Sequence, residues 1–205
     1  MKENGAFPSG FYKETDGIFR LQIPFDGLYT SVFLIETEAG AFLLDCGTTK
    51  EDVEELLLPA LEELGYDATA LAGVVLSHRH DDHAGGLPYL LAHAKELAVI
   101  TDERALAQGV VTYALAGHTE DSLGVLDTRS GTLITGDGLQ FDGVNQYPRS
   151  TPFLDAYLAT LDKIARDGRV ENMLYSHAYD PERKDAARGR DAVLRALTLC
   201  RELVK

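Results

Sequence analysis

The chain has 205 residues, of which 45% are hydrophobic and 25% are charged, and these values are typical of a globular protein of about one domain. Its hydrophobic runs are too short to span a membrane, and its first residues lack a signal-peptide pattern. We therefore expect a single cytoplasmic domain over residues 1–205 with no membrane contact. The net charge of −14 disfavours a nucleic acid partner, because an acidic surface repels phosphates.

The first third of the chain predicts an antiparallel meander followed by a helix. Hydrophobic residues alternate or run together at strand length in three segments that glycines separate, residues 18–23, 29–36 and 41–45. Apolar residues at helical spacing then predict a helix over 50–64, and Gly65 is a natural stop for it.

The rest of the chain mixes strands with helices. Short apolar runs predict strands over 71–76, 98–101, 110–116, 123–126, 132–135 and 172–175. Helical spacing predicts helices over 86–96, 152–167 and 181–204, and the last two open with proline. This alternation favours a layered α/β fold.

One short segment, residues 77–83, carries a metal-ligand pattern: Ser-His-Arg-His-Asp-Asp-His. His78 and His80 lie two residues apart, so on an extended segment both point to the same side. Asp82 and His83 follow where the chain turns, and they point away from the first pair. One metal ion would not take all four easily, whereas two ions could share them, one pair each.

Three further ligand types follow predicted strands. His118 comes after 110–116, Asp137 after 132–135 and His177 after 172–175. Because functional groups gather at the carboxyl ends of strands in α/β sheets, we expect one site where these ends meet. His93, inside the predicted 86–96 helix, lies outside this pattern, and we interpret it as structural or exposed.

Other catalytic patterns are missing from the sequence. It has no nucleophile elbow, no P-loop and no convincing dinucleotide-binding glycine motif, which disfavours serine hydrolases and nucleotide-binding proteins. The two cysteines fit a reducing compartment and stand in no metal-binding spacing. Two cations about 3.5 to 4 Å apart need no protein nucleophile, because they can share a hydroxide and polarise a carbonyl.

The order of these motifs resembles the metallo-β-lactamase superfamily of metallohydrolases. The resemblance covers residues 29–177 and rests on Leu-Leu-Asp-Cys-Gly around Asp45, the His-x-His-x-Asp-His motif, Gly-His-Thr at His118, Thr-Gly-Asp at Asp137, and His177. It implies an αββα sandwich with two divalent metal ions at one edge. Zinc is the expected metal, with iron or manganese as alternatives.

The resemblance also implies a role for each motif residue. The ligands of the first metal would be His78, His80 and His118. Those of the second would be Asp82, His83 and His177, with Asp137 as a bridge between the two. Asp82 would also be catalytic, by orienting the attacking hydroxide. Asp45 would support the ligands from behind, and a simple turn residue is the alternative for it.

Within the superfamily, the metal motifs are most similar to those of hydroxyacylglutathione hydrolases, including Ala-Gly-Gly after His83. Only about 28 residues follow His177, too few for the glutathione-binding domain of those enzymes, so glutathione thioesters are not supported. We expect a binuclear hydrolase that uses a metal-bound hydroxide on an ester, thioester or lactone of a small molecule. The alternatives are a mononuclear iron redox enzyme similar to persulfide dioxygenases, and, less favoured, a β-lactamase or a non-catalytic metal-binding protein.

Two further segments could contribute substrate contacts, and the oligomeric state stays open. The loop 138–150 offers Tyr147 and Arg149, and Tyr179 follows His177 closely; aromatic packing on the next helix is the alternative for this loop. Residues 182–205 carry seven basic and four acidic side chains. They form either a solvated helix face or a cationic rim that attracts an anionic substrate.

Overall fold

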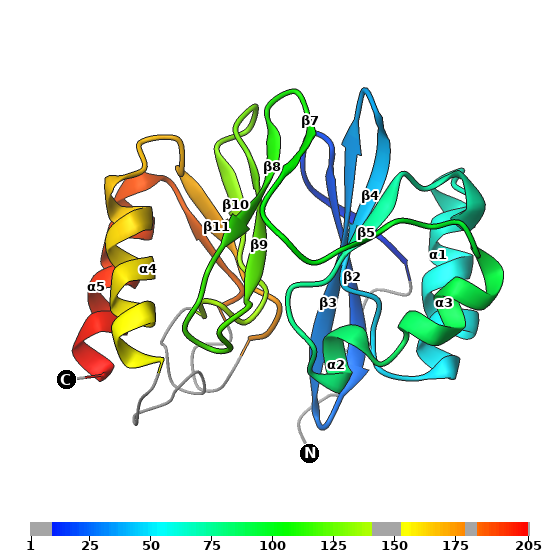
Figure 1. Ribbon diagram of the computed structural model, residues 1–205, viewed down its shortest axis with the longest axis horizontal. Helices are drawn as coiled ribbons and strands as arrows, with labels where there is room; N and C mark the ends of the chain where they lie inside the picture. Colours follow the sequence, from blue (N-terminus) through cyan, green and yellow to red (C-terminus); the bar gives the residue numbers. More distant parts are fainter. Residues whose placement is uncertain (1–9, 141–152, 179–183, 205) are drawn as a thin grey trace, which may run out of the picture.

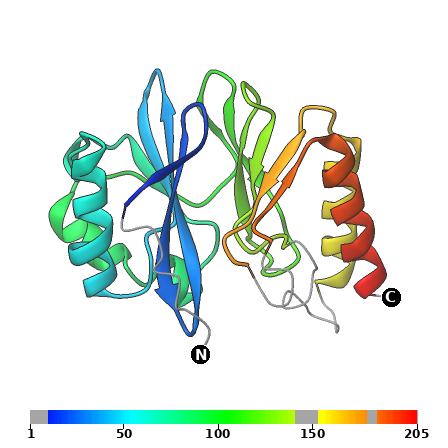
Figure 2. The same cartoon turned by 180° about the vertical axis from the view of Figure 1, so that it is seen from behind.

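The computed structural model describes residues 10–140, 153–178 and 184–204, and these form an αββα sandwich (Figure 1). Two six-stranded sheets face each other, in the orders β1-β2-β3-β4-β5-β6 and β12-β11-β10-β9-β8-β7. Helices cover the outer face of each sheet, as the view from behind also shows (Figure 2). The predicted fold class is confirmed. Within these described ranges, no helix is long and apolar enough to cross a membrane.

The first sheet contains the predicted meander. Its strands are β1 (Tyr12–Thr15), β2 (Ile18–Phe25), β3 (Leu28–Thr37), β4 (Gly40–Leu44), β5 (Gly73–Val75) and β6 (Val99–Ile100). Strands β1 to β4 pair antiparallel, and β4, β5 and β6 pair parallel. Asp26 and Gly27 both have positive φ, so β2 and β3 are joined by the tight two-residue turn that an Asp-Gly pair favours.

The second sheet comes from the later part of the chain. Its strands are β7 (Ala105–Ala107), β8 (Val110–Ala114), β9 (Leu123–Asp127), β10 (Thr132–Ile134), β11 (Asn172–Leu174) and β12 (Ala186–Arg188). Strands β10 and β11 pair parallel, and the other neighbours pair antiparallel.

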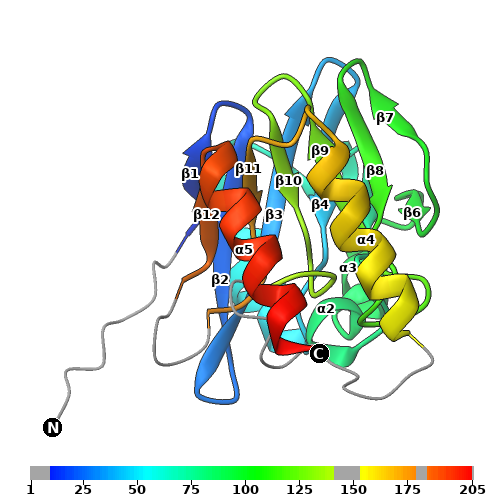
Figure 3. The same cartoon turned by 90° about the vertical axis from the view of Figure 1, so that its left-hand side faces the viewer.

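The helices divide between the two outer layers. The π-helical turn η1 (Asp52–Leu57) runs into α1 (Leu58–Glu63), and together with α3 (Leu87–His93) they pack on the first sheet. The 3₁₀ turn η2 (Ala68–Ala70) precedes β5, and the short helix α2 (Asp81–Ala84) follows it. Helices α4 (Leu154–Arg166) and α5 (Arg190–Leu203) lie on the second sheet (Figure 3).

Three apolar layers hold these elements together. The first fills the space between the first sheet and its helices, and the second does the same for the second sheet. The third lies between the sheets and includes Phe33, Ile35, Val75, Val125 and Leu174, all fully buried. Burial on both faces explains why these strands read as continuous apolar runs in the sequence.

The predicted helix over 181–204 is wrong in its first part. Residues Ala186–Arg188 form the edge strand β12, and α5 begins only at Arg190, after Gly189 with φ of 86°. A three-residue strand is too short to show a period of two, so the surrounding helical spacing dominates the prediction. The sequence also fails to predict strands β1 and β7, because each is short and half-exposed.

Candidate metal centre

The structure brings all seven candidate ligands together at one end of the two sheets. His78 and His80 follow β5, and Asp82 and His83 lie on α2. The other three come from the second sheet: His118 follows β8, Asp137 follows β10 and His177 follows β11. Ligand types that are up to a hundred residues apart in the sequence therefore meet at the strand ends.

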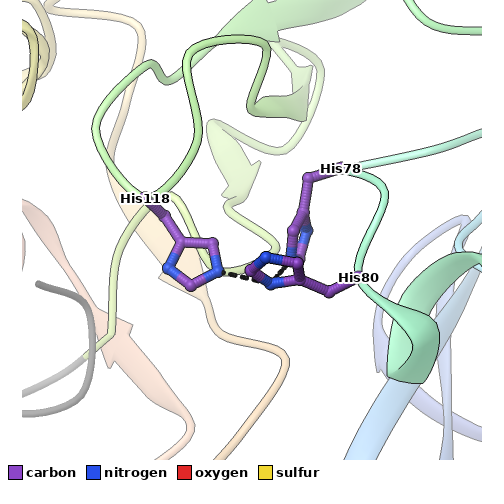
Figure 4. Close-up of side chains that lie close together, drawn as sticks. All are labelled: His78, His80 and His118. Carbon is purple, nitrogen blue, oxygen red and sulfur yellow. Dashed lines mark hydrogen bonds between the residues drawn. The ribbon is translucent and has the colours of Figure 1, made fainter. Parts of the chain in front are cut away.

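The first group consists of three histidines whose ring nitrogens converge (Figure 4). His78 Nε2 lies 2.9 Å from His80 Nδ1, and His118 Nε2 lies 3.0 Å from the same atom. Together the three rings could hold one metal ion. His78 is buried, whereas His80 is exposed and His118 is partly exposed, so this group faces solvent on one side.

The second group is formed by Asp82, His83 and His177, and it also could hold a metal ion. The His83 and His177 Nε2 atoms lie 3.2 Å apart, and Asp82 Oδ2 lies 3.1 Å from the former and 3.2 Å from the latter. Both histidines are buried, and Asp82 is partly exposed. This group is therefore the deeper of the two.

Asp137 lies between the two groups, and each of its oxygens faces a different one. Its Oδ1 lies 3.4 Å from His83 Nε2 and 3.2 Å from His177 Nε2. Its Oδ2 lies 3.7 Å from His118 Nε2. A carboxylate in this position can contact both groups at once.

Contacts behind the histidines fix which ring nitrogen points inward. His177 Nδ1 donates to the backbone carbonyl of Tyr29 at 2.7 Å, and His83 Nδ1 donates to Asp45 Oδ2 at 2.8 Å. Because carbonyl and carboxylate oxygens only accept, each Nδ1 carries the proton of the neutral ring, and each Nε2 presents its lone pair to the centre. His78 Nδ1 lies 3.0 Å from Ser77 Oγ, and because the Ser77 hydroxyl donates to Asp45 Oδ2, its oxygen can accept from His78 Nδ1.

In the second group, hydrogen-bond acceptors therefore face one another. In their neutral forms, the two Nε2 lone pairs of His83 and His177 face the carboxylates of Asp82 and Asp137. Such an arrangement is unfavourable unless positive charge lies among the acceptors, supplied either by protons or by a metal ion. The donor set, nitrogen with carboxylate oxygen, suits zinc and related divalent ions.

The pKa values of the metal-free centre show the same demand for positive charge. Burial lowers the pKa of His177, but hydrogen bonds with Asp137 and Asp82 outweigh it and raise that pKa to about 9. Burial raises the pKa of Asp137, but His83 and His177 hold it well below its usual range. In the first group, burial lowers the pKa of His78 to about 2 and also lowers that of His118. Protons are thus favoured at His177 and disfavoured at His78 and His118.

Asp45 supports the centre from behind. It follows β4 with φ of 65°, and its carboxylate accepts hydrogen bonds from the Ser77 backbone N–H at 2.7 Å, the Ser77 hydroxyl at 2.8 Å and His83. The two interpretations of this residue therefore combine, since it is a turn residue that also orients His83. The contacts of Ser77 with Asp45 and His78 are not predicted from the sequence, which shows only a small residue before His78.

Close packing of α2 on the first sheet sets the position of Asp82 and His83. A Cβ atom on Gly85 would lie 2.4 Å from the Thr48 carbonyl oxygen, and one on Gly86 would lie 2.3 Å from that of Cys46. Hydrogen bonds from the Cys46 N–H to the His83 carbonyl, at 3.0 Å, and from Gly86 to Gly47, at 2.9 Å, complete the contact. Only glycine fits at these two positions.

The other residues singled out in the sequence lie outside this cluster or outside the described residues. Tyr147, Arg149 and Tyr179 lie outside the described residues. His93 lies on α3 and is exposed, with its Nε2 3.3 Å from Glu54 Oε1. In α5, Arg190 donates to the carbonyls of Ile164, Ala165 and Val170, and Arg201 pairs with Asp162. These two arginines therefore make contacts within the fold, and the choice between a solvated helix face and a cationic rim stays open for the segment.

Part of the chain matches a known family model. Residues 25–109 match the family model described as the metallo-beta-lactamase superfamily. The chain is 26% identical over 152 residues to the lactamase-like protein adaB of Aspergillus niger, an alignment that covers 66% of this chain and 46% of adaB. The chain thus spans about half the length of the curated relatives it matches.

Solved structures agree in fold. The DIM-1 metallo-beta-lactamase superposes with a TM-score of 0.71 at 16% identity, covering 97% of this chain and 100% of that one. Rubredoxin oxygen:oxidoreductase from Desulfovibrio gigas gives a TM-score of 0.64 at 16% identity, covering 95% of this chain and 61% of that one.

The fold is that of the metallo-β-lactamase superfamily, and residues 25–109 match that superfamily's family model. Its members bind divalent metal ions, and most are metal-dependent hydrolases. The cluster of histidine and aspartate side chains at the strand ends agrees with this class.

Proposed function

We propose that the chain is a binuclear metal-dependent hydrolase that cleaves an ester, thioester or lactone of a small molecule. The observation that carries the proposal is the position of Asp137, whose two oxygens face two separate groups of ligand atoms. A carboxylate placed in this way would offset the repulsion between two cations held close together.

The residues present fit two ions. The residues that would hold the first ion are His78, His80 and His118, those that would hold the second are Asp82, His83 and His177, and Asp137 would join the two sets. Zinc is the metal we expect, with iron or manganese as alternatives. When bound, two such cations would lower the pKa of a water molecule to about 7 and polarise a substrate carbonyl.

The protein's own groups would position the reactants. Asp82 is more exposed than Asp137, with 14% of its side chain accessible against 9%, and it would orient the attacking water by accepting its hydrogen bond. His80 is exposed, whereas His83 and His177 are buried, so the substrate would approach from the side of the first group. Asp45 would keep the Nε2 of His83 turned inward.

The choice of acyl substrates rests on the metal motifs, whose sequence resembles that of hydroxyacylglutathione hydrolases. The net charge of −14 supports a small molecule over a nucleic acid. We place the protein in the cytoplasm as part of the same proposal.

A substrate panel with metal analysis tests the function. The purified protein would be dialysed, its metal content measured by elemental analysis, and its turnover assayed on thioesters, lactones, aryl esters, β-lactams and phosphodiesters. We expect close to two divalent ions per chain and turnover of at least one acyl substrate that a chelator abolishes. Hydrolysis that persists after both ions are removed would contradict the proposal.

A single-iron redox enzyme is the second candidate, because the group of His78, His80 and His118 could hold one ion by itself. The same preparation separates the two functions. One iron per chain together with oxygen uptake would favour the redox enzyme, whereas two ions without oxygen uptake would favour the hydrolase.

A further inference from the structure

The face of β3 that is turned toward the second sheet is polar at one end of the strand and apolar at the other. Alternate residues share a face of a strand, and Phe33 and Ile35 belong to the apolar layer between the sheets. Tyr29 and Ser31 occupy the same face at the end nearest the metal centre. At the Tyr29 end, the side-chain contacts of β3 across the sandwich are polar, because the hydroxyls of Tyr29 and Ser31 donate to oxygen atoms beside the second sheet.

Such polar contacts also hold the segment directly after β11, which includes His177. Ser31 Oγ donates to the carbonyl of Ser176 at 2.8 Å, and both groups are buried. His177 Nδ1 donates to the carbonyl of Tyr29 at 2.7 Å. A ligand that belongs to the second sheet by sequence is therefore oriented by the backbone of the first sheet.

The side chain of Tyr29 is itself anchored. Its hydroxyl donates to Asp185 Oδ2 at 2.8 Å, and Arg20 donates to the same oxygen at 2.6 Å. Arg20 is fully buried on β2, where its Nε lies 2.7 Å from Glu14 Oε1 and its guanidinium lies 4.8 Å from the centre of the Phe33 ring. The Asp185 carbonyl also accepts from the Tyr175 N–H at 2.9 Å, two residues before His177.

We propose that Arg20, Tyr29 and Asp185 form an inter-sheet clasp that positions His177 and so sets the affinity of the second metal group. The clasp fixes the Tyr29 carbonyl, and that carbonyl fixes the ring of His177. These three are positioning residues, because they act on the metal group through the orientation of His177. The inference rests on the proposed two-metal function.

The first metal group provides an internal reference. His78 is oriented by Ser77, His80 contacts His78 and His118, and His118 also contacts Asp137. None of these contacts involves the clasp. Loosening the clasp should therefore weaken the second ion and leave the first ion in place.

The test is a zinc titration of the metal-free protein against a chromophoric chelator, which yields two stepwise dissociation constants. Tyr29→Phe removes the hydroxyl and keeps the ring and the backbone. We expect the second constant to weaken by about tenfold to a hundredfold, as for other residues that orient metal ligands, and the first to change by less than about twofold.

Tyr66→Phe is the matched control. Tyr66 makes an equivalent bond, from its hydroxyl to Glu36 Oε1 at 2.7 Å, at the opposite end of β3. We expect it to leave both constants unchanged. Asp185→Asn is a second variant, because it keeps the size of the side chain and removes the charge that Arg20 pairs with. The visible absorption of protein loaded with cobalt should change only for the second equivalent in both clasp variants.

The outcomes separate the clasp from the proposed function. If Tyr29→Phe binds both ions with the constants of the unaltered protein, or if its affinity for both ions falls equally, the proposed role of the clasp is wrong. The two-metal centre would stand in either case. If the unaltered protein binds fewer than two zinc ions, the proposed function fails and the clasp fails with it.

Discussion

Protons and metal ions compete for the same lone pairs at His83 and His177. In the metal-free protein, the carboxylates around them raise the pKa of His177 to about 9 and that of His83 well above its ordinary value, against the effect of burial. At neutral pH both rings therefore carry a second proton, on Nε2, that a metal ion must displace. His78 and His118 have lowered pKa values and hold no such proton.

This difference predicts that the two metal groups respond differently to pH. Zinc affinity of the second group should rise as pH increases from 6.5 to about 9, by about tenfold per pH unit for each proton released, and then level off. Affinity of the first group should change much less in that range. Titrations at several pH values, in buffers of different ionisation enthalpy, would measure both constants and the protons released. If the two dissociation constants depended equally on pH, the difference in protonation described here between the two groups would be wrong.

At the scale of residues, the sequence identifies ligand types but not what orients them. The seven candidate ligands can be selected because histidine and aspartate recur after apolar runs, and the structure brings these seven together. Asp45 is found through its motif. The contact of Tyr29 with His177 could not be found, because it uses a backbone carbonyl that every residue carries. Arg20 gives no signal either, since its burial depends on Asp185, which is 165 positions away.

Among the elements, α2 depends on glycine for its position. It carries Asp82 and His83, and its C-terminal side packs so closely on the segment after β4 that Gly86 has no space for a side chain. The carbonyl of Cys46 that a Cβ would meet is backbone and cannot rotate away. Any side chain at Gly86 must therefore move α2 itself.

We predict that Gly86→Ala destabilises the protein by about 1–3 kcal/mol, as overpacking does, and weakens the second metal ion more than the first. Gly168→Ala is the control, because a Cβ there would meet no atom of the described residues within 4 Å, and it should change stability by less than about 0.5 kcal/mol. Denaturant unfolding and stepwise zinc titration would measure these effects. A Gly86→Ala protein with unchanged stability and metal content would contradict the packing described for α2.

Elements with long periodic patterns are predicted well from the sequence, and short ones are not. The meander of β2, β3 and β4 and the helix α4 follow from alternation and helical spacing. Strand β12 falls inside a predicted helix because three residues cannot display a strand period. The π-helical turn η1 has only six residues, which are too few for its i→i+5 hydrogen bonding to change the apolar spacing visibly.

For the whole molecule, the proposed metal ions would link the two halves of the sandwich. Four of the candidate ligands follow β5 of the first sheet, and His118, Asp137 and His177 follow strands of the second. Each proposed ion therefore has ligands from both sheets. The layers and the meeting of these strand ends agree with the fold expected from the motifs, whereas the extent of the single domain stays a prediction.

Removal of metal should therefore lower the stability of the whole fold. A ligand that binds only the folded state stabilises it by about 2.7 kcal/mol when its free concentration is a hundred times its dissociation constant. We expect the thermal midpoint to fall by several degrees on chelation and to recover when zinc is added back, as scanning calorimetry would show. A midpoint that does not respond to chelation, in protein known to contain metal beforehand, would mean that the ions do not join the sheets.

The most direct measurement of the central claim, a pair of metal ions bridged by Asp137, is metal stoichiometry after dialysis in three variants. Asp137→Ala should bind clearly fewer than two ions and retain the remaining one more weakly, because it loses the contact to both groups. Asp82→Ala should keep close to one tightly held ion, at His78, His80 and His118, with turnover lower by about a hundredfold or more. His93→Gln, outside the centre, should keep two. If Asp137→Ala retains two ions and near-normal turnover, then Asp137 is not a bridge and the binuclear account is wrong.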